Sequence, residues 1–396
     1  MELKPGYKKT EVGVIPDDWK VSSLSELGDI RSGGTPSTSK SEFWDGGIPW
    51  CTPTDITSLK GRKYLQETSR TLSDKGLRSS SAEIIPTRSL IMTSRATIGE
   101  CAINVLPMTT NQGFKNIVPF DCLNIEYLYY VMTTQKSRLV SLCGGSTFLE
   151  IGKKQLSSFQ IQLPKSRAEQ IAIADALSDI DALLESLQQL ITKKRSIKQA
   201  AMQELLTGKT RLPGFDGEWE VKKIGELSRI GRGRVISHME ILKSSNPTYP
   251  VFSSQTSNSG IMGYLDSYDF EGDYVTWTTD GANAGTVFAR SGRFNCTNVC
   301  GTIKPHDSDH HFLAAALGRV SQPHVSRHLG NPKLMNDVMK KIEVMIPKTR
   351  EEQAAIATVL SDMDAEINAL EQRWKKTRDI KQAMMQELLT GKTRLL

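Results

Sequence analysis

The feature that most constrains the fold of this chain is a long segment that occurs twice. Pro164–Leu212 aligns without a gap with Pro347–Leu395, about two-thirds of the aligned positions are identical, and both copies contain MQELLTGKTRL. A fainter match relates Trp19–Leu27 to Trp219–Leu227. Internal duplication explains both matches. The chain therefore consists of two units, each with a variable globular region followed by a nearly constant segment.

Each copy also contains Gly-Lys-Thr, the sequence that ends a nucleotide-binding P-loop. A P-loop requires a glycine five positions before its Gly-Lys, so that backbone N–H groups can surround a phosphate. Gln203 and Gln386 occupy those positions, inside segments with helical periodicity. The sequence therefore predicts no nucleotide site here. It predicts instead that Gly208 and Gly391 end helices with positive φ angles.

The repeated segments are predicted to be long helices. Ser166–Glu169 and Thr349–Glu352 have the capping-box pattern. Apolar residues then recur in alternating steps of four and three, at Ile173, Leu177, Ile180, Leu184, Leu187 and Ile191 and again at Ile356, Leu360, Met363, Ile367, Leu370 and Trp374. One such apolar seam flanked by polar residues is typical of a coiled coil. We expect the two helices to pair in antiparallel orientation; the alternative is that they are core helices of a bundle.

The regions between these helices have a different pattern. Short segments rich in β-branched and aromatic residues, such as Ser89–Thr93 and Tyr274–Trp277, alternate with turns rich in Gly, Ser and Asn. The expected fold class is α+β: two α/β domains at residues 1–163 and 213–346, separated by long helices at 164–212 and 347–396 that form an antiparallel coiled coil, with a pseudo-two-fold internal repeat.

Composition limits the function classes. The chain has 396 residues, six scattered cysteines and a formal net charge of +6. It has no long apolar run and no apolar signal core near its N-terminus, so the sequence favours a cytoplasmic protein without membrane association. The cysteines are expected to be reduced. The mild positive charge is compatible with a nucleic-acid partner without requiring one.

Motifs of self-contained enzymes are incomplete. Gly231-Arg-Gly233 is followed by Ile236 where a dinucleotide-binding fingerprint needs a third glycine. Asn246-Pro-Thr-Tyr249 lacks the second proline of the motif that amino-methyltransferases use, and we interpret it as a turn. We predict no catalytic residue, no metal site and no cofactor.

The loops offer side chains suited to DNA. Arg can bind guanine, Asn and Gln can bind adenine, and Lys can neutralise phosphates. The predicted DNA-binding residues of the first domain are Thr35, Ser94, Arg95, Asn111, Gln112, Lys115, Lys153 and Lys154. Those of the second domain are Arg232, Arg234, Gln255, Thr279, Asp280, Asn283, Asn298 and Lys333. Thr279, Asp280 and Asn283 align with the loop Thr93–Gly99, and Asn298 aligns with Asn111.

Taken together, these features resemble the specificity subunits of type I restriction-modification enzymes over essentially the whole chain. The resemblance is carried by the doubled helix ending QELLTGKTRL and by Trp19 and Trp219. It also includes Ser32–Pro36 with Gly47–Trp50 in the first half, and Tyr249–Phe252 with Gly281–Gly285 in the second.

The resemblance implies that each globular region recognises one half of a bipartite site on double-stranded DNA, while the helices set the spacing. It implies two adenine-N6 methyltransferase subunits and motor-nuclease restriction subunits as partners. Glu169, Gln170, Asp179 and Asp181, with Glu352, Gln353, Asp362 and Asp364, are candidates for the partner-binding surface. Two alternatives stay open: a self-contained DNA methyltransferase or nuclease with its own catalytic site, and a coiled-coil protein-interaction scaffold.

Overall fold

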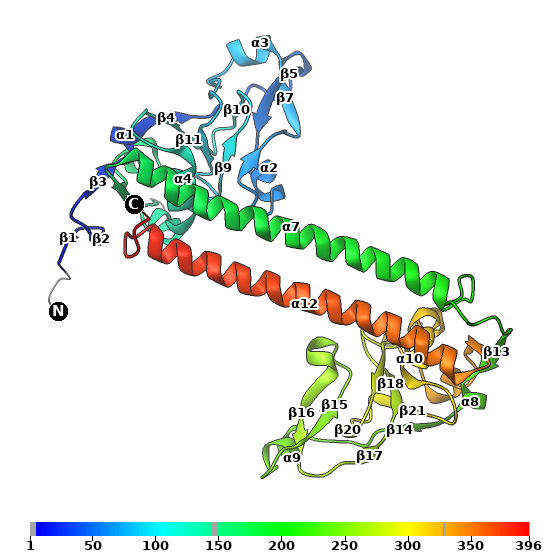
Figure 1. Ribbon diagram of the computed structural model, residues 1–396. Helices are drawn as coiled ribbons and strands as arrows, with labels where there is room; N and C mark the ends of the chain where they lie inside the picture. The colour runs from blue at the N-terminus through cyan, green and yellow to red at the C-terminus, as the bar shows by residue number, and fades with distance from the viewer. Residues whose placement is uncertain (1–4, 144–148, 328–329, 396) are drawn as a thin grey trace. The chain divides into compact units, whose positions relative to one another are not determined.

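The computed structural model describes residues 5–143, 149–327 and 330–395 (Figure 1). The chain divides into two compact units, residues 1–186 with 374–396 and residues 187–373. Both long helices cross this division, so each unit contains one globular domain and part of each helix. The helices are α7 (Arg167–Leu205) and α12 (Arg350–Leu388).

The described residues of the first domain form three sheets and a hairpin. Its strands are β1 (Tyr7–Thr10), β2 (Gly13–Pro16), β3 (Trp19–Ser23), β4 (Gly28–Ser32), β5 (Trp44–Cys51), β6 (Tyr64–Leu65), β7 (Arg70–Leu72), β8 (Leu90–Met92), β9 (Cys101–Asn104), β10 (Thr109–Thr110), β11 (Lys115–Pro119) and β12 (Gln160–Pro164). The sheet orders are β4-β11-β8-β9-β6, β10-β5-β7 and β12-β3, and β1 pairs with β2. The helices are α1 (Leu24–Leu27), η1 (Ser41–Phe43), α2 (Pro53–Ser58), α3 (Asp74–Arg78), α4 (Ile125–Thr134), α5 (Lys136–Ser141) and α6 (Lys153–Ser157).

The second domain repeats this plan with fewer elements. Its strands are β13 (Trp219–Lys223), β14 (Ser228–Arg232), β15 (Tyr249–Phe252), β16 (Ile261–Leu265), β17 (Phe270–Glu271), β18 (Tyr274–Thr278), β19 (Val287–Arg290), β20 (Arg293–Cys296), β21 (Cys300–Pro305) and β22 (Glu343–Pro347). The sheet orders are β14-β21-β18-β19, β16-β15-β20-β17 and β13-β22. The helices are α8 (Ile224–Leu227), α9 (His238–Leu242), η2 (Ser257–Gly260), α10 (His310–Val320), η3 (Gln322–His324) and α11 (Asn336–Met339).

The predicted α+β class with two long packed helices is confirmed. Within the first unit Asp181 of α7 pairs with Lys381 of α12, at 2.6 Å, and Glu169 pairs with Arg394 beyond the end of α12. Residues later in α7 therefore pair with residues earlier in the segment that contains α12, so the two helices run antiparallel. The predicted seam is buried or half-buried at all twelve positions, with Ile173 and Leu177 fully buried.

Each domain packs its longest helix between a sheet and the start of a long helix. In the first core Tyr127 and Leu128 of α4 pack with Ile173 of α7. In the second core Phe312 and Leu313 of α10 pack with Ile356 of α12. A glutamine fixes each contact: the Gln170 side chain accepts from the Asn124 N–H at the start of α4, and Gln353 accepts from Asp309 in the same way. The repeated helices thus carry the residues that orient both domains.

The glycines of the MQELLTGKTRL segments have the predicted backbone conformation. Gly208 has φ +69° and Gly391 has φ +72°, a region that favours glycine. A Cβ atom at Gly391 would lie 2.6 Å from Pro16, and one at Gly208 would lie 3.2 Å from the ring of Trp219. These glycines let the chain leave each helix in close contact with the tryptophan-bearing strand of a domain.

Candidate nucleic-acid interface

Equivalent backbone loops lie side by side in both domains. The turn after β10 meets the loop after β8, where Ser94 N–H donates to the Gly113 carbonyl at 2.7 Å. The turn after β20 meets the loop after β18, where Thr279 N–H donates to the Val299 carbonyl at 2.9 Å. We call residues 94–99 with 111–113 and residues 279–285 with 297–299 the recognition loops of the two domains. They are the same scaffold with different side chains.

A glycine directly after the neighbouring strand, β4 or β14, makes this arrangement possible. A Cβ atom at Gly33 would lie 2.0 Å from the Asn111 carbonyl oxygen, and one at Gly233 would lie 2.2 Å from the Cys296 carbonyl oxygen. No side chain fits at either position. Without this close approach, the segments after β4 and β14 would be held away from the recognition loops.

The structure corrects one predicted equivalence. Phe114 N–H donates to the Asn111 carbonyl, and Cys300 N–H donates to the Thr297 carbonyl. Asn111 therefore corresponds to Thr297, and Asn298 corresponds to Gln112. The predicted alignment of Asn298 with Asn111 is wrong by one residue, because the segments that connect the strands differ in length. The predicted equivalence of the two loops after β8 and β18 is confirmed, since Gly99 and Gly285 donate to Thr93 and Thr278.

In the first domain a carboxylate that was not predicted organises the loop. Arg95 Nη2 lies 2.8 Å from Glu150, and Lys115 Nζ lies 3.6 Å from the same carboxylate. The hydrogen bond from Arg95 holds the pKa of Glu150 below its usual range. Burial lowers the pKa of Lys115, an effect that the nearby Glu150 opposes. Two of the predicted DNA-binding cations are thus brought together around one carboxylate.

In the second domain the predicted residues converge more completely. Arg232 Nη2 lies 2.9 Å from Asp280 and 3.1 Å from the Thr279 hydroxyl, while Arg232 Nε donates to the Asn298 carbonyl at 2.6 Å. Lys333 Nζ lies 3.8 Å from Asp280. Arg232, Thr279, Asp280, Asn298 and Lys333 therefore form one cluster at the recognition loops.

Several predicted contact residues are buried or support a turn. The side chains of Ser94 and Thr279 have no exposed surface, and Lys115 is 6% exposed. The Asn111 side chain accepts from the Gly113 N–H at 2.8 Å and so stabilises its own turn. In this conformation these residues shape the loops, and of the four only Asn111 is partly exposed to solvent. Gln112 is exposed and its side chain accepts from Thr35.

Three predicted residues of the second domain lie outside its cluster. Arg234 pairs with Glu240 and Asp269, at 2.7 and 2.9 Å. Gln255 donates to the Ile261 carbonyl, and Asn283 donates to the Ser254 carbonyl at 3.0 Å. Their present partners are structural: Glu240 belongs to α9, Asp269 directly precedes β17, Ile261 begins β16 and Ser254 follows β15.

Lys153 and Lys154 lie at a separate position on the first domain. They line a surface cavity of about 670 Å³ together with Ser23, Ser25, Ser157, Ser158 and Gln160. Two exposed ammonium groups beside several hydroxyls provide hydrogen-bond donors of the kind that contact a DNA phosphate. This cavity remains a predicted site of contact with the phosphates of the DNA backbone.

Half of the predicted partner-binding residues are buried inside their own unit. Glu169, Gln170, Glu352 and Gln353 are at most 4% exposed. Glu169 binds Arg394, and Glu352 binds Arg211 at 2.6 Å. The two glutamates that the sequence assigns to capping boxes thus pair with arginines remote in sequence. Because all four residues are buried, they are unsuited to contact another subunit. Asp181 and Asp364 also pair internally, whereas Asp179 and Asp362 are exposed.

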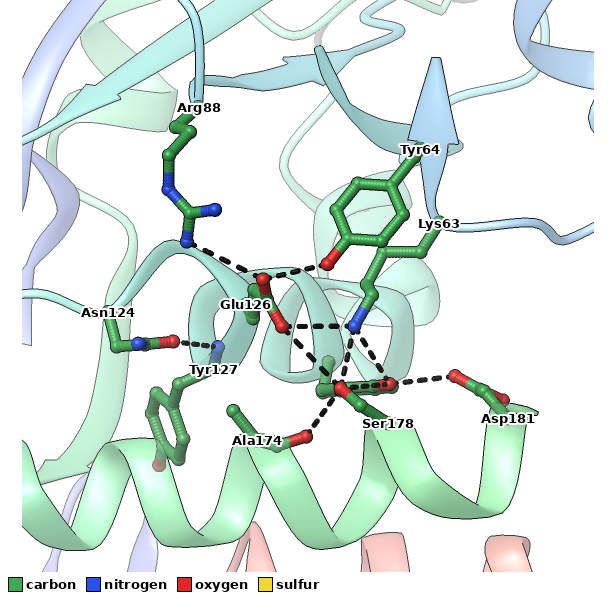
Figure 2. A network of polar contacts seen from close by, with 10 residues as sticks. Lys63, Tyr64, Arg88, Asn124, Glu126, Tyr127, Ala174, Ser178 and Asp181 are labelled. Atoms are coloured by element: carbon green, nitrogen blue, oxygen red, sulfur yellow. Dashed lines mark hydrogen bonds and ion pairs between the residues drawn. The ribbon is translucent and has the colours of Figure 1, made fainter. Parts of the chain in front are cut away.

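Figure 2 shows a second unpredicted network, between the first domain and α7. Lys63 Nζ lies 3.1 Å from Glu126 of α4 and 2.7 Å from Ser178 of α7. Glu126 also accepts from the Tyr64 hydroxyl at 2.7 Å, and Arg88 lies 3.5 Å away. Burial by itself raises the pKa of Glu126, but the hydrogen bonds from Tyr64 and Lys63 outweigh it and hold the pKa below its usual range.

This network continues along α7. The Tyr130 hydroxyl donates to Asp181 at 2.7 Å, and Asp181 also pairs with Lys381 of α12. Burial raises the pKa of Tyr130, so its hydroxyl stays protonated and acts as a donor. Sequence reasoning missed Glu150, Lys63 and Glu126. Their only sequence signal is a charge beside an apolar segment, and that signal does not identify a partner.

The described residues offer no metal centre and no membrane span. Within residues 5–143, 149–327 and 330–395, no group of three His, Cys, Asp or Glu side chains is placed to hold a metal ion. In the same ranges, no helix has the length and apolar character needed to cross a membrane. None of the six cysteines, all of which lie in these ranges, forms a disulfide in the structure.

Comparison with known families matches both halves of the chain. The family model for the type I restriction modification DNA specificity domain matches residues 16–194 and again 216–381. The specificity subunit of the type I restriction enzyme MjaIX from Methanocaldococcus jannaschii is 34% identical over 252 residues, covering 59% of this chain and 57% of the relative. The EcoR124I/EcoR124II specificity subunit from Escherichia coli is 30% identical over 201 residues, covering 49% of this chain and 46% of the relative. The match thus spans about half the length of these curated relatives.

Solved structures share the fold over nearly the full length. The crystal structure of a type I restriction-modification S subunit from M. genitalium aligns with a TM-score of 0.65 at 15% identity, covering 98% of each chain. A structure described under complex assembly and conformational transition of the type I R-M system aligns with a TM-score of 0.57 at 16% identity, covering 96% of this chain and 99% of that one.

Proposed function

This chain belongs to the family of type I restriction modification DNA specificity domains, and from that premise we propose that it recognises a bipartite site on double-stranded DNA. Each domain recognises one half of the site through its recognition loops. The two long helices set the number of unspecified base pairs between the halves.

The observation that carries this proposal is one scaffold with two side-chain sets. The recognition loops of both domains have matching backbone hydrogen bonds. Their side chains differ, with Arg95 and Gln112 in the first domain and Asp280 and Asn298 in the second. The residues bridged to these loops, Glu150 and Lys333, differ as well. A common frame with different side chains is what two domains need if they recognise different sequences by contacts to base edges.

The roles of the predicted residues follow from their positions. The exposed side chains of Arg95, Gln112 and Lys333 suit contacts to base edges or phosphates. Lys153 and Lys154 suit phosphate contacts in their surface cavity. Buried Ser94, Lys115 and Thr279 hold the loops in shape.

We propose the same division of labour for the chemistry. The chain supplies sequence recognition, and two adenine-N6 methyltransferase subunits carry out methyl transfer on an adenine turned out of the duplex. Motor-nuclease restriction subunits join for cleavage and consume ATP. Family membership and the match of each half to the specificity domain support this division. Exposed Asp179 and Asp362 remain candidate contacts for these subunits.

Expression of this chain with a methyltransferase partner tests the proposal. Genome-wide mapping of methylated adenines should show one bipartite target with a fixed spacer. Replacing the first domain by that of a relative should change one half-site and leave the other half and the spacer intact. Methylation by the purified chain alone would support a self-contained enzyme. Binding without sequence selectivity in the presence of the methyltransferase would support a protein-interaction scaffold.

A further inference from the structure

In both domains an ion pair joins the recognition loop to a neighbouring segment at the same place, and its polarity is opposite in the two domains. Arg95 and Glu150 form an isolated antiparallel bridge, and so do Asp280 and Lys333. Next to the first bridge, Ile151 N–H donates to the Ser94 carbonyl at 3.0 Å; next to the second, Leu334 N–H donates to the Thr279 carbonyl at 2.8 Å. Arg95 thus corresponds to Asp280, and Glu150 corresponds to Lys333. The positions of the cation and the carboxylate in this bridge are therefore exchanged between the two domains.

A second cation accompanies the carboxylate in each domain and comes from a different strand. In the first domain it is Lys115, the first residue of β11, 3.6 Å from Glu150. In the second domain it is Arg232, the last residue of β14, 2.9 Å from Asp280. The register places Lys115 opposite Ser32 of β4 and places Arg232 opposite Gly301 of β21. Each cluster therefore has one carboxylate and two cations, although the cations do not occupy equivalent positions.

The exposure of the side chains separates their roles. Arg95 is 48% exposed against 33% for Glu150, and Lys333 is 49% exposed against 20% for Asp280. In both bridges the cation is the more accessible partner and the carboxylate the less accessible one. With two cations to one carboxylate, each cluster also has excess positive charge, which favours acceptor groups on DNA.

We propose that Glu150 and Asp280 are positioning residues, each of which holds an exposed cation at its recognition loop. The side of the bridge on which this cation lies helps to determine which base sequence the domain recognises in its half-site. This proposal rests on the proposed function. Arg95 presents a planar guanidinium on the loop itself and recognises a guanine through O6 and N7. Lys333 presents a single ammonium group from the opposite side of the bridge, where selectivity for one base is weaker.

The test measures binding by the complex of the full chain with methyltransferase subunits. Duplexes carry the target mapped for the wild-type chain, with each base of each half-site varied in turn. We expect Glu150→Gln to lower discrimination at one base pair of the first half-site by about tenfold, because Arg95 is no longer held, with no change in the second half-site. Arg95→Lys should weaken discrimination at the same base pair. Glu42→Gln is the matched control, since it breaks an exposed pair with Lys75 in the same unit.

A charge exchange separates positioning from a merely structural role. The triple variant Arg95→Glu, Glu150→Arg, Lys115→Met moves the cation to the side used by the second domain, and the third change removes an ammonium group that would face the new arginine. We expect a folded complex that binds a changed first half-site with the original second half-site and spacer. An unchanged first half-site in this variant, or equal discrimination in the wild type and Glu150→Gln, would overturn the inference. Absence of any bipartite target for the wild type would refute the proposed function itself.

Discussion

Identical residues of the two repeated helices have partly different partners in the two units. Glu169 and Glu352 are equivalent, as are Arg394 and Arg211, and each glutamate is paired with the arginine of its own unit. Of these two glutamates, only Glu352 also accepts a hydrogen bond from a tryptophan, whose Nε1 atom (Trp219) lies 3.3 Å away. Trp19 Nε1 is buried without a hydrogen-bond partner among the described residues.

A second difference lies about two and a half to three turns further along the helices. Asp181 accepts a hydrogen bond from Tyr130 and forms an ion pair with Lys381, and Ser178 accepts a hydrogen bond from Lys63. The equivalent Asp364 pairs with Lys198, but the positions of Tyr130 and Glu126 are taken by Ala315 and His311. Identical residues in a repeat thus have different energetic roles, because each domain supplies its own side chains to them.

The largest effect is expected from removing the arginine that neutralises a buried glutamate. Arg394→Met should lower the free energy of local unfolding of the first unit by about 3–4 kcal/mol, because Glu169 loses its cation in a buried site. Arg211→Met should cost about 2 kcal/mol, because the Trp219 N–H remains on Glu352. Hydrogen exchange at the start of α7 and of α12 measures both. Equal losses would show that the tryptophan contact does not matter.

Removing the lysine of the Figure 2 network comes next. Lys63→Met leaves Glu126 with Tyr64 and Arg88, and we expect a loss of about 2 kcal/mol in the first unit, less than for a fully enclosed pair. His311→Gln is the matched control in the second unit, since His311 corresponds to Glu126 and is exposed. Thermal unfolding of both variants checks the contrast. If His311→Gln is the more damaging change, the proposed asymmetry is incorrect.

The two helix-ending glycines should respond unequally. Gly391→Ala combines an unfavourable positive φ with a contact of 2.6 Å to Pro16, whereas Gly208→Ala meets the Trp219 ring at 3.2 Å. We expect losses of about 2 and about 1 kcal/mol respectively. Hydrogen exchange at the C-terminal turns of α12 and α7 distinguishes them. A larger effect at Gly208 would mean that the hairpin containing Pro16 moves to accommodate the new methyl group at position 391 at little cost in free energy.

The smallest effect concerns acid sensitivity. The folded-state pKa of Glu126 is lowered, so its contribution is complete above the unfolded-state pKa of about 4.3 and is lost as pH falls through the folded-state value. The stability difference between the wild type and Glu126→Gln should therefore shrink on acidification below about pH 4.3. Urea unfolding at several pH values measures it, with His311→Gln as the control. A difference that grows on acidification would contradict the assigned direction.

Local patterns predicted the parts of this molecule that depend on neighbours in sequence. Heptad spacing located the seam from Ile173 to Ile191, and the glycine positions located the helix ends, because helix periodicity and positive φ are properties of a short segment. The loops after β8 and β18 were also found from their turn residues. The Asn298 register was missed because the intervening segments differ in length, so local likeness could not fix which residues share hydrogen bonds.

Partners remote in the chain could not be inferred. Lys63 and Ser178 are 115 positions apart, and Arg394 and Glu169 are 225 apart. Whether a glutamate caps its helix or pairs with a distant arginine depends on which side chain the fold brings within a few ångströms. For that reason Glu169 and Glu352 were assigned to a partner surface from their sequence pattern, although both are buried.

The amino-acid sequence by itself determined that two different domains alternate with two helices of closely similar sequence, because duplication and periodicity can be recognised from residue order alone. Tertiary structure alone decided which charges meet. The exchanged bridges at Arg95–Glu150 and Asp280–Lys333 show this most clearly. Each residue separately is a common polar loop residue, and only the folded backbone, which brings the same two positions together in both domains, makes them comparable.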